Sequence, residues 1–217
     1  MKNLVILVVV LVLVAGGIYY YKKSREKIPN SPFEEYPQGE VDNSSTPTSE
    51  LVTPQEGNQE KLTYDQYLQQ GINYETKGEL LKAISSYRKA SELAPKEYVP
   101  YSNAGSAYYS MQKYTEAEDH FLQALELVPN NVSVYTKLYE VYFYGLKRNP
   151  EQMTTFFQDA MKNTNNSVNI VTLYASYLEQ INDPESALPI WQSLLQVEPD
   201  NAAYKAKVEA LQKKING

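Results

Sequence analysis

The apolar and polar residues divide the chain into three parts with different patterns. Residues 4–21 form an apolar run without a charged side chain. Residues 28–62 are dominated by proline, acidic and small polar residues and show no periodicity. From Thr63 onward, apolar residues recur at intervals of three and four, the spacing of amphipathic helices. The pattern therefore predicts an apolar N-terminal segment, a polar linker and a helical domain.

The apolar run has the length of a membrane span. As a helix, residues 4–21 would extend for about 27 Å, close to the roughly 30 Å hydrocarbon core of a bilayer. Tyrosines at 19–21 suit the membrane interface. Four basic residues follow at once: Lys22, Lys23, Arg25 and Lys27. We therefore expect a single-pass transmembrane anchor, with its basic flank, over residues 1–27.

Two aspects of this segment stay open. Ala15, Gly16 and Gly17 offer small residues for a signal peptidase, so a cleaved signal peptide is the alternative to a retained anchor. The basic residues after the run slightly favour a cytoplasmic helical domain under the positive-inside rule. A short head carrying Lys2 is also typical of export anchors, so the sequence leaves the side of the membrane undecided.

Residues 28–62 have the composition of a linker. They contain five of the chain's 12 prolines, and seven acidic residues face the single base Lys61. Such a segment cannot bury enough apolar surface to offset the entropy lost on ordering it. The composition predicts a disordered acidic tether between the anchor and the helical domain.

The helical domain repeats itself with a period of 34 residues. In the first copy the signature residues are Tyr67, Gly71, Tyr74, Ala83, Tyr87, Ala90 and Pro95. The matching residues of the second copy are Tyr101, Gly105, Tyr108, Ala117, Phe121, Ala124 and Pro129. Each copy has two helical halves, separated at Lys77-Gly78 and near Gln112-Lys113, and a proline ends the second half. A period of this size indicates stacked helical hairpins.

This signature resembles the tetratricopeptide repeat (TPR), in which small residues and large aromatic residues alternate along two antiparallel helices. The resemblance implies an all-α fold: a right-handed superhelix of about four helix–turn–helix repeats and a C-terminal capping helix, following the transmembrane helix. The TPR domain would cover 63–199, with repeats at 64–97, 98–131, 132–167 and 168–201, and the capping helix 200–217. Most of the chain's 20 tyrosines would then be core residues.

The third and fourth copies depart from the signature. Ala187, Trp191 and Pro199 follow their first-copy counterparts by 104 residues, which is three periods and two extra residues. We place this insertion in the turn 145–150, with Asn149 as helix cap and Pro150 as first helical residue. Tyr139 occupies the glycine position of the third copy, which predicts a wider spacing between copies two and three.

Two further helix caps are expected. Thr115 and Glu118 have the spacing of a capping box at the start of a second helix. Asp200 is expected to cap the last helix, whose lysines suit the polar outer face of a terminal helix.

Composition restricts the chemistry. The 217 residues include 26 acids and 20 bases, giving a net charge of −6 and arguing against nucleic acid as the main ligand. Without cysteine and with His120 as the single histidine, thiol chemistry is excluded and a metal site or catalytic triad has few possible members. We expect no enzyme activity, no metal and no cofactor.

The TPR resemblance implies binding of a protein or peptide along the concave face of the first helices. The candidate contacts are Asn103, Tyr109, Lys137, Glu140, Phe143 and Tyr144. Glu75 and Glu140 would favour a ligand with some positive charge. Leu68, Ile72 and Ser133 occupy positions where the chaperone-binding subset of the family needs lysine or asparagine, so a carboxylate clamp is not expected. The expected function is a membrane-tethered interaction scaffold; the alternative is a structural subunit of a cell-envelope or secretion assembly.

Overall fold

The computed structural model describes residues 62–217. They belong to one compact unit, Glu60–Gly217. The predicted anchor, and all but the last residue of the predicted linker, lie outside the described residues. Within them the fold is all-helical, with nine α-helices and no strand, which confirms the predicted fold class for this part of the chain.

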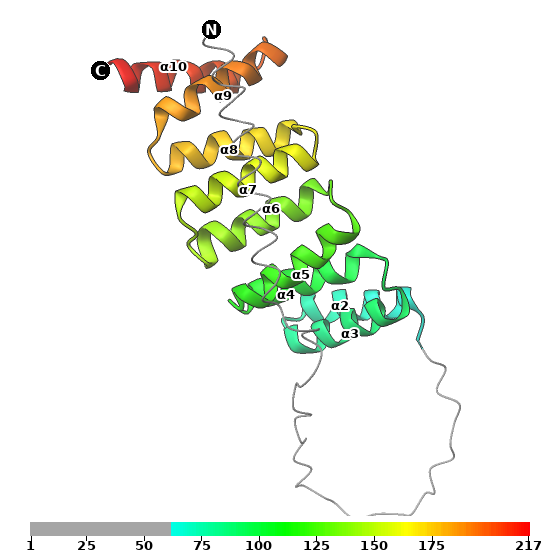
Figure 1. Ribbon diagram of the computed structural model, residues 1–217. Coiled ribbons are helices and arrows are strands. Elements are labelled where there is room, and N and C mark those ends of the chain that lie inside the picture. Colours follow the sequence, from blue (N-terminus) through cyan, green and yellow to red (C-terminus); the bar gives the residue numbers. More distant parts are fainter. Residues whose placement is uncertain (1–61) are drawn as a thin grey trace, which may run out of the picture. The chain divides into compact units, whose positions relative to one another are not determined.

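The helices follow one another as a stack of hairpins (Figure 1). Their bounds are α2 Tyr64–Thr76, α3 Leu80–Leu93, α4 Tyr98–Ser110, α5 Tyr114–Leu127, α6 Val132–Glu140, α7 Pro150–Asn163, α8 Val168–Gln180, α9 Pro184–Val197 and α10 Ala202–Asn216. A π-helical turn, η1 (Val141–Gly145), continues α6. The predicted break at Lys77-Gly78 is confirmed: α2 ends there, and Gly78 has φ +76°, a conformation that glycine adopts without strain.

The glycine of the signature permits close contact within a hairpin. A Cβ on Gly105 would lie 2.9 Å from the ring of Phe121, and one on Gly71 would collide with the ring of Tyr87. Tyr87 and Phe121 are 0% and 1% exposed, so these rings fill the space that each glycine leaves.

Each inner hairpin buries one apolar row against the preceding hairpin. In α4 the row is Pro100, Ala104 and Ala107, and in the third repeat it is Val134, Leu138 and Val141; all six residues are buried. The same positions of α2 carry Gln66, Gln70 and Asn73, of which two are exposed and Gln70 accepts a hydrogen bond from Ser86. These positions are therefore polar at the α2 end of the stack.

The predicted insertion is confirmed between the two helices of the third repeat. The extra residues are taken up by η1 and by the loop 146–149, whose backbone is tied to η1 by the bond from the Arg148 N–H to the Tyr142 carbonyl, 2.9 Å. Asn149 caps α7 in a capping box with Gln152, and Pro150 is the first helical residue, as predicted.

The predicted capping box at Thr115 and Glu118 is wrong. Helix α5 begins at Tyr114, two residues before the start that this box implies, and its N-cap Lys113 makes no side-chain cap bond. Glu118 instead accepts two hydrogen bonds from the Arg148 guanidinium, both 3.0 Å. The cation also lies over the Tyr142 ring, 5.3 Å from its centroid. This ion pair joins the second repeat to the inserted loop of the third.

Tyr139 replaces the signature glycine in α6 and changes the packing around it. It is 4% exposed, and its ring centroid lies 5.7 Å from that of Phe157 and 6.4 Å from that of Tyr177. The wider spacing predicted at the junction of repeats two and three is found chiefly within the third repeat. There the backbones of α6 and α7 approach less closely than those of α2 and α3 or of α4 and α5, because aromatic rings fill the space between them.

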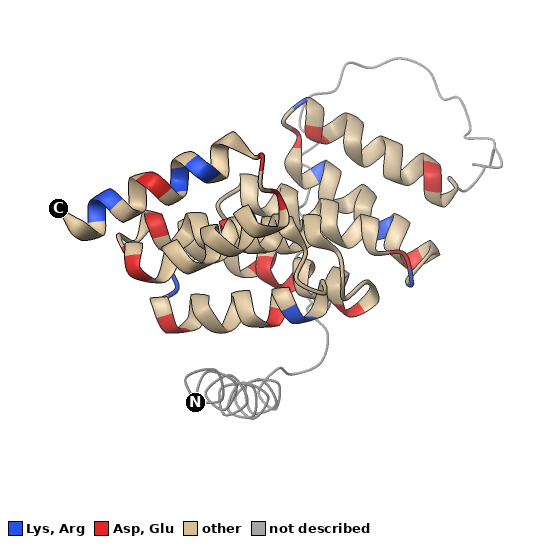
Figure 2. Cartoon of the chain, turned by 90° about the horizontal axis from the view of Figure 1, so that it is seen from above, with Lys and Arg blue, Asp and Glu red and all other residues tan. Residues whose placement is uncertain are grey.

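Helix α10 closes the other end of the stack. Val208 and Leu211 are buried, and the Tyr204 ring lies 5.5 Å from Trp191 of α9. The outer face of α10 is polar and rich in lysine, as Figure 2 shows near the C-terminus. The predicted cap Asp200 is wrong by one residue: Asn201 accepts the bonds from the N–H groups of residues 203 and 204, because the first helical residue is Ala202.

Candidate peptide-binding face

The candidate contact residues come from three helical segments: the first helices of repeats two and three, and the π-helical turn that continues the latter. Asn103 and Tyr109 lie on α4, Lys137 and Glu140 on α6, and Phe143 and Tyr144 on η1. Lys137 is exposed and Tyr144 is 54% exposed, whereas the other four are half-buried. Large side chains on this face are thus partly accessible, unlike the buried rings of the repeat core.

Three of these residues, Tyr109, Phe143 and Tyr144, form what we call the aromatic shelf. Phe143 and Tyr144 meet edge to face, with ring centroids 4.9 Å apart. Phe143 also stacks on Tyr139 at 5.6 Å and meets Tyr177 of α8 at 5.5 Å, so the fourth repeat supports the shelf from behind. Such edge-to-face and stacked pairs each stabilise a cluster by about 0.5–1.5 kcal/mol beyond burial.

Two residues that the sequence pattern did not indicate, Tyr114 and Gly145, position the shelf. The Tyr114 ring lies 5.7 Å from Tyr109 and packs against the backbone of Gly145, where a Cβ would lie 2.5 Å from the ring. A side chain at residue 145 would push η1 away from α5. The lone glycine after Tyr144 was the available signal, but its distance in sequence from Tyr114 hid the contact.

Burial is the main influence on the ionisation of two tyrosines at the shelf, Tyr109 and Tyr139. Burial raises the pKa of the Tyr109 hydroxyl, and the negative charge of Glu140 raises it further, followed by Tyr114 and Tyr144. Burial also raises the pKa of the Tyr139 hydroxyl, which donates a hydrogen bond to Gln180 at 3.2 Å. The Tyr109 and Tyr139 hydroxyls are therefore neutral at physiological pH.

Glu75, the other acid proposed as a ligand contact, has a structural role instead. Its carboxylate accepts a hydrogen bond of 2.6 Å from the buried Tyr87 hydroxyl. Glu179, 104 residues later, accepts one of 2.8 Å from the indole N–H of Trp191. Each acid thus satisfies the polar atom of its repeat's core aromatic residue.

The middle repeats differ from the outer ones at these two positions. Their core aromatics, Phe121 and Phe157, have no polar atom, and Tyr109 and Phe143 stand where the outer repeats have glutamate. A glutamate is therefore not required there, and the two positions supply the aromatic shelf. In the outer repeats a glutamate therefore accompanies a core ring that donates a hydrogen bond. In repeats two and three an aromatic residue accompanies a core phenylalanine, so the shelf lies in these two repeats.

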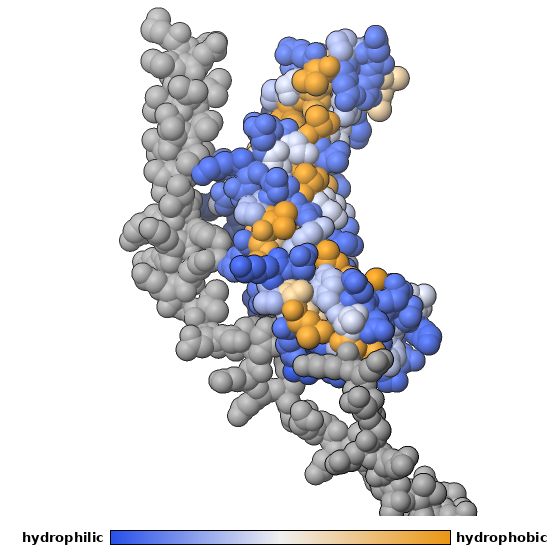
Figure 3. Space-filling view, turned by 90° about the vertical axis from the view of Figure 1, so that its right-hand side faces the viewer, coloured by the Kyte–Doolittle hydropathy of each residue, from blue (hydrophilic) through white to orange (hydrophobic). Residues whose placement is uncertain are grey.

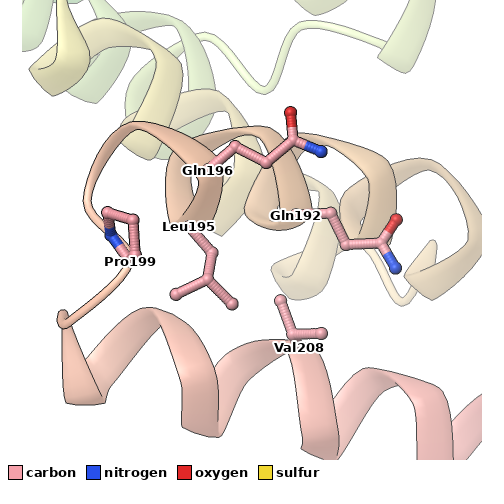
Figure 4. A pocket seen from close by; sticks show the side chains of 5 residues that line it. All are labelled: Gln192, Leu195, Gln196, Pro199 and Val208. Carbon is pink, nitrogen blue, oxygen red and sulfur yellow. The ribbon is translucent and has the colours of Figure 1, made fainter.

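A second concave feature lies between α9 and α10. Figure 4 shows the hollow, with the side chains of Leu195 and Val208 pointing toward each other across it. The other lining residues are Gln192, Gln196 and Pro199. No ionisable side chain lines it, so this hollow provides neither an acid–base group nor a metal ligand.

His120 does not form part of a reactive site. It stacks on Tyr108 with ring centroids 5.1 Å apart, and burial lowers the pKa of the imidazole to about 4. Over residues 62–217, no cluster of histidine, aspartate and glutamate has the geometry of a metal site. In the same part of the chain, no helix combines the length and apolar character of a membrane span. The segment 4–21 lies outside it.

Comparison with known proteins supports the repeat assignment. Residues 65–97 and 99–131 match family models of the tetratricopeptide repeat. Tetratricopeptide repeat protein 6 of Homo sapiens is 34% identical over 61 residues, which are 28% of this chain and 12% of that protein. The match thus spans only a small part of that relative's length. These comparisons identify two tetratricopeptide repeats in the chain.

Solved structures extend the likeness to the whole described unit. MamA superposes with a TM-score of 0.52 at 14% identity, covering 69% of this chain and 81% of MamA. A tetratricopeptide repeat protein of Parabacteroides merdae gives 0.52 at 16% identity, covering 70% and 59% of the two chains. PilF of Pseudomonas aeruginosa gives 0.51 at 20% identity, covering 70% and 69%. The fold is a TPR-like solenoid, an architecture that suggests a scaffold for protein–protein interaction.

Proposed function

We propose that the protein is a membrane-tethered scaffold that binds a peptide segment of a protein partner on the face formed by α4, α6 and η1. Residues 4–21 would hold it at the membrane, and the acidic linker would let the helical unit reach its partner. The scaffold would do no chemistry, in keeping with the usual role of TPR folds. The partner would be recognised through an extended segment lying across the first helices of repeats two and three.

The observation that carries this proposal is the exposure of the aromatic shelf. Tyr144 keeps 54% of its surface accessible although it belongs to a cluster of four aromatic rings with Tyr139, Phe143 and Tyr177. Aromatic residues that present an apolar face and a polar tip at the surface are enriched at protein interfaces. A peptide crossing the shelf would bury that face.

The rival function, a structural subunit of a permanent assembly, would require a broad apolar interface. Figure 3 shows one side of the unit, on which apolar surface occurs as separate patches among hydrophilic residues. Permanent interfaces resemble a protein core cut in half and are more continuous than this. That side of the molecule favours selective contacts.

A site-specific photo-crosslinker tests where the partner binds. We would place a photoreactive amino acid at Ser110, an exposed residue of α4 close to the shelf, and at Glu92, an exposed residue of α3. Adducts with a defined partner are expected from residue 110 and not from residue 92, and Tyr144→Ala should abolish them. Equal adducts from both positions would contradict binding on this face.

The membrane tether is tested separately. Deletion of residues 1–27 should move the protein from the membrane fraction to the soluble fraction without altering its helical spectrum. Continued membrane association of the shortened chain would refute a tether through residues 4–21.

A further inference from the structure

Glu140 differs from the other half-buried carboxylates among the residues described. Each of the others accepts a hydrogen bond or forms an ion pair within the chain: Glu75, Glu79, Glu116, Glu118, Glu179 and Asp183. No such bond or pair engages Glu140. A half-buried charge without a partner has lost part of its hydration, so a ligand cation placed beside it would compensate that loss.

The groups around Glu140 suit a flat cation. Glu140 and Tyr144 are four residues apart on the continuous helix α6–η1, so their side chains lie on neighbouring turns of one side. Tyr109 is held near the same turn through Tyr114, whose ring lies 5.7 Å from that of Tyr109 and packs against Gly145. The face of a tyrosine ring attracts a guanidinium or ammonium group within about 6 Å of its centroid. Two tyrosines and one carboxylate can therefore sandwich a cation and neutralise it.

The chain supplies no such cation of its own in the described part. Four rings there have a lysine or arginine placed over them: Tyr67, Tyr74, Tyr142 and Trp191. None of the three rings of the shelf has one. Lys137 lies one turn before Glu140 on α6, but it is exposed and the two form no ion pair. The shelf thus offers a cation site that the described chain leaves unfilled.

We propose that Tyr109, Glu140 and Tyr144 form a subsite for an arginine or lysine side chain in the bound peptide. The subsite rests on the proposed function, because it recognises one residue of the segment that the scaffold binds. The Glu140 carboxylate supplies the counter-charge, the two tyrosines supply ring faces, and Phe143 forms the apolar floor. Arginine binds better than lysine, since its planar guanidinium stacks on tyrosine while its N–H groups reach a carboxylate.

An acidic or uncharged peptide residue fits this place less well. An acid would face Glu140 at close range, and the repulsion would add to the cost of removing both charges from water. An uncharged side chain would cover Glu140 without compensating it. The partner segment therefore carries a basic residue at the point where it crosses η1.

The probe is a short Gly–Ser peptide carrying one arginine, titrated into the full-length chain in a non-ionic detergent and followed by calorimetry and amide NMR. The matched control peptide carries citrulline, which keeps the shape of arginine and removes its charge. Glu140→Gln removes the counter-charge, and Glu92→Gln on α3 makes the same charge change away from the shelf. Tyr144→Ala removes a ring that is already half exposed, so the fold should survive.

The arginine peptide should shift the amide signals of residues 140–145, and the citrulline peptide should not. Glu140→Gln should weaken arginine binding roughly tenfold or more, as expected for loss of a hydrogen-bonded charge. Tyr144→Ala should weaken it about threefold, and Glu92→Gln should leave it unchanged. Equal binding of the two peptides, or an unaltered affinity after Glu140→Gln, would overturn the subsite.

Two outcomes distinguish this subsite from occupation by the chain's own basic segment and from scaffold binding without a cation subsite. In one outcome the arginine peptide binds only after Lys22, Lys23, Arg25 and Lys27 are replaced by glutamine. The chain's own basic segment would then occupy the subsite in the parent protein, and the proposal that a partner's basic residue occupies it would be overturned. If partner crosslinks at residue 110 persist in Glu140→Gln while the arginine preference is absent, the scaffold function stands and the cation subsite fails.

Discussion

Replacement of Gly71 by alanine sets two opposing effects against each other in the first repeat. Alanine is a better helix former than glycine by about 1 kcal/mol, so propensity alone predicts a more stable α2. The structure predicts the reverse, because the added Cβ would collide with the ring of Tyr87. That ring is 0% exposed, and its hydroxyl is held by Glu75 at 2.6 Å.

The size of the stability loss in Gly71→Ala depends on how far the Tyr87 ring must move. Overpacking a tight core costs about 1–3 kcal/mol, and a shift of the Tyr87 ring also strains its hydrogen bond to Glu75. After the propensity gain, Gly71→Ala should destabilise the first repeat by about 2 kcal/mol. Gly105→Ala should cost less, about 0–1 kcal/mol, because Phe121 lies farther away, at 2.9 Å, and has no hydroxyl to restrain it.

The assay uses residues 60–217, first shown by circular dichroism to be helical and cooperatively folded. Urea unfolding measures global stability, and hydrogen exchange in α2 and α3 measures the first repeat, which can open by itself because it ends the stack. A loss of 2 kcal/mol corresponds to roughly thirtyfold faster exchange. In the Tyr87→Phe background, where the ring is freed from Glu75, the cost of Gly71→Ala should fall.

A neutral or stabilising Gly71→Ala would refute the packing argument, since helix propensity would then outweigh the contact. Ala175→Gly provides the matched control. Ala175 occupies the same position in the fourth repeat and is 0% exposed. Its loss should cost about 2 kcal/mol, because helix propensity and burial of the methyl group are both lost.

Two further predictions concern the end of the stack and the buried histidine. Ending the chain at Pro199 removes Tyr204, Val208 and Leu211 from the surroundings of Trp191. The shortened chain should therefore be less soluble, and its tryptophan emission should shift to the red. Equal behaviour of the full and shortened chains would count against a capping role for α10. Burial lowers the imidazole pKa of His120 from 6.5 to about 4. Because the unfolded chain binds this proton more readily, the folded state should lose up to about 3 kcal/mol of stability as the pH falls from about 6.5 to about 4. Urea midpoints at neutral pH and near pH 4.5 should differ less in His120→Phe than in the parent; an unchanged difference would disprove the assignment.

The sequence determined the features that depend on neighbours along the chain. The period of 34 residues, the break at Gly78 and the cap at Asn149 with Pro150 were predictable, because small residues, positive φ and missing N–H groups act within one helix or turn. Even there, ambiguity between adjacent polar residues misplaced one cap: Asn201, not Asp200, accepts the first N–H bonds of α10.

Only the tertiary structure decided which polar and aromatic groups are engaged in hydrogen bonds and ring contacts within the protein. Glu75 looked like a ligand contact until Tyr87, 12 residues away, was seen to bind it, and Glu118 is held by Arg148 across 30 residues. The contact of Tyr114 with Gly145 joins two repeats in the same way. Hydrogen bonds and ring contacts depend on distances between helices, which no pattern within one helix contains. Because those contacts engage Glu75 and, within the described residues, not Glu140, the fold rather than the sequence distinguishes these two acids.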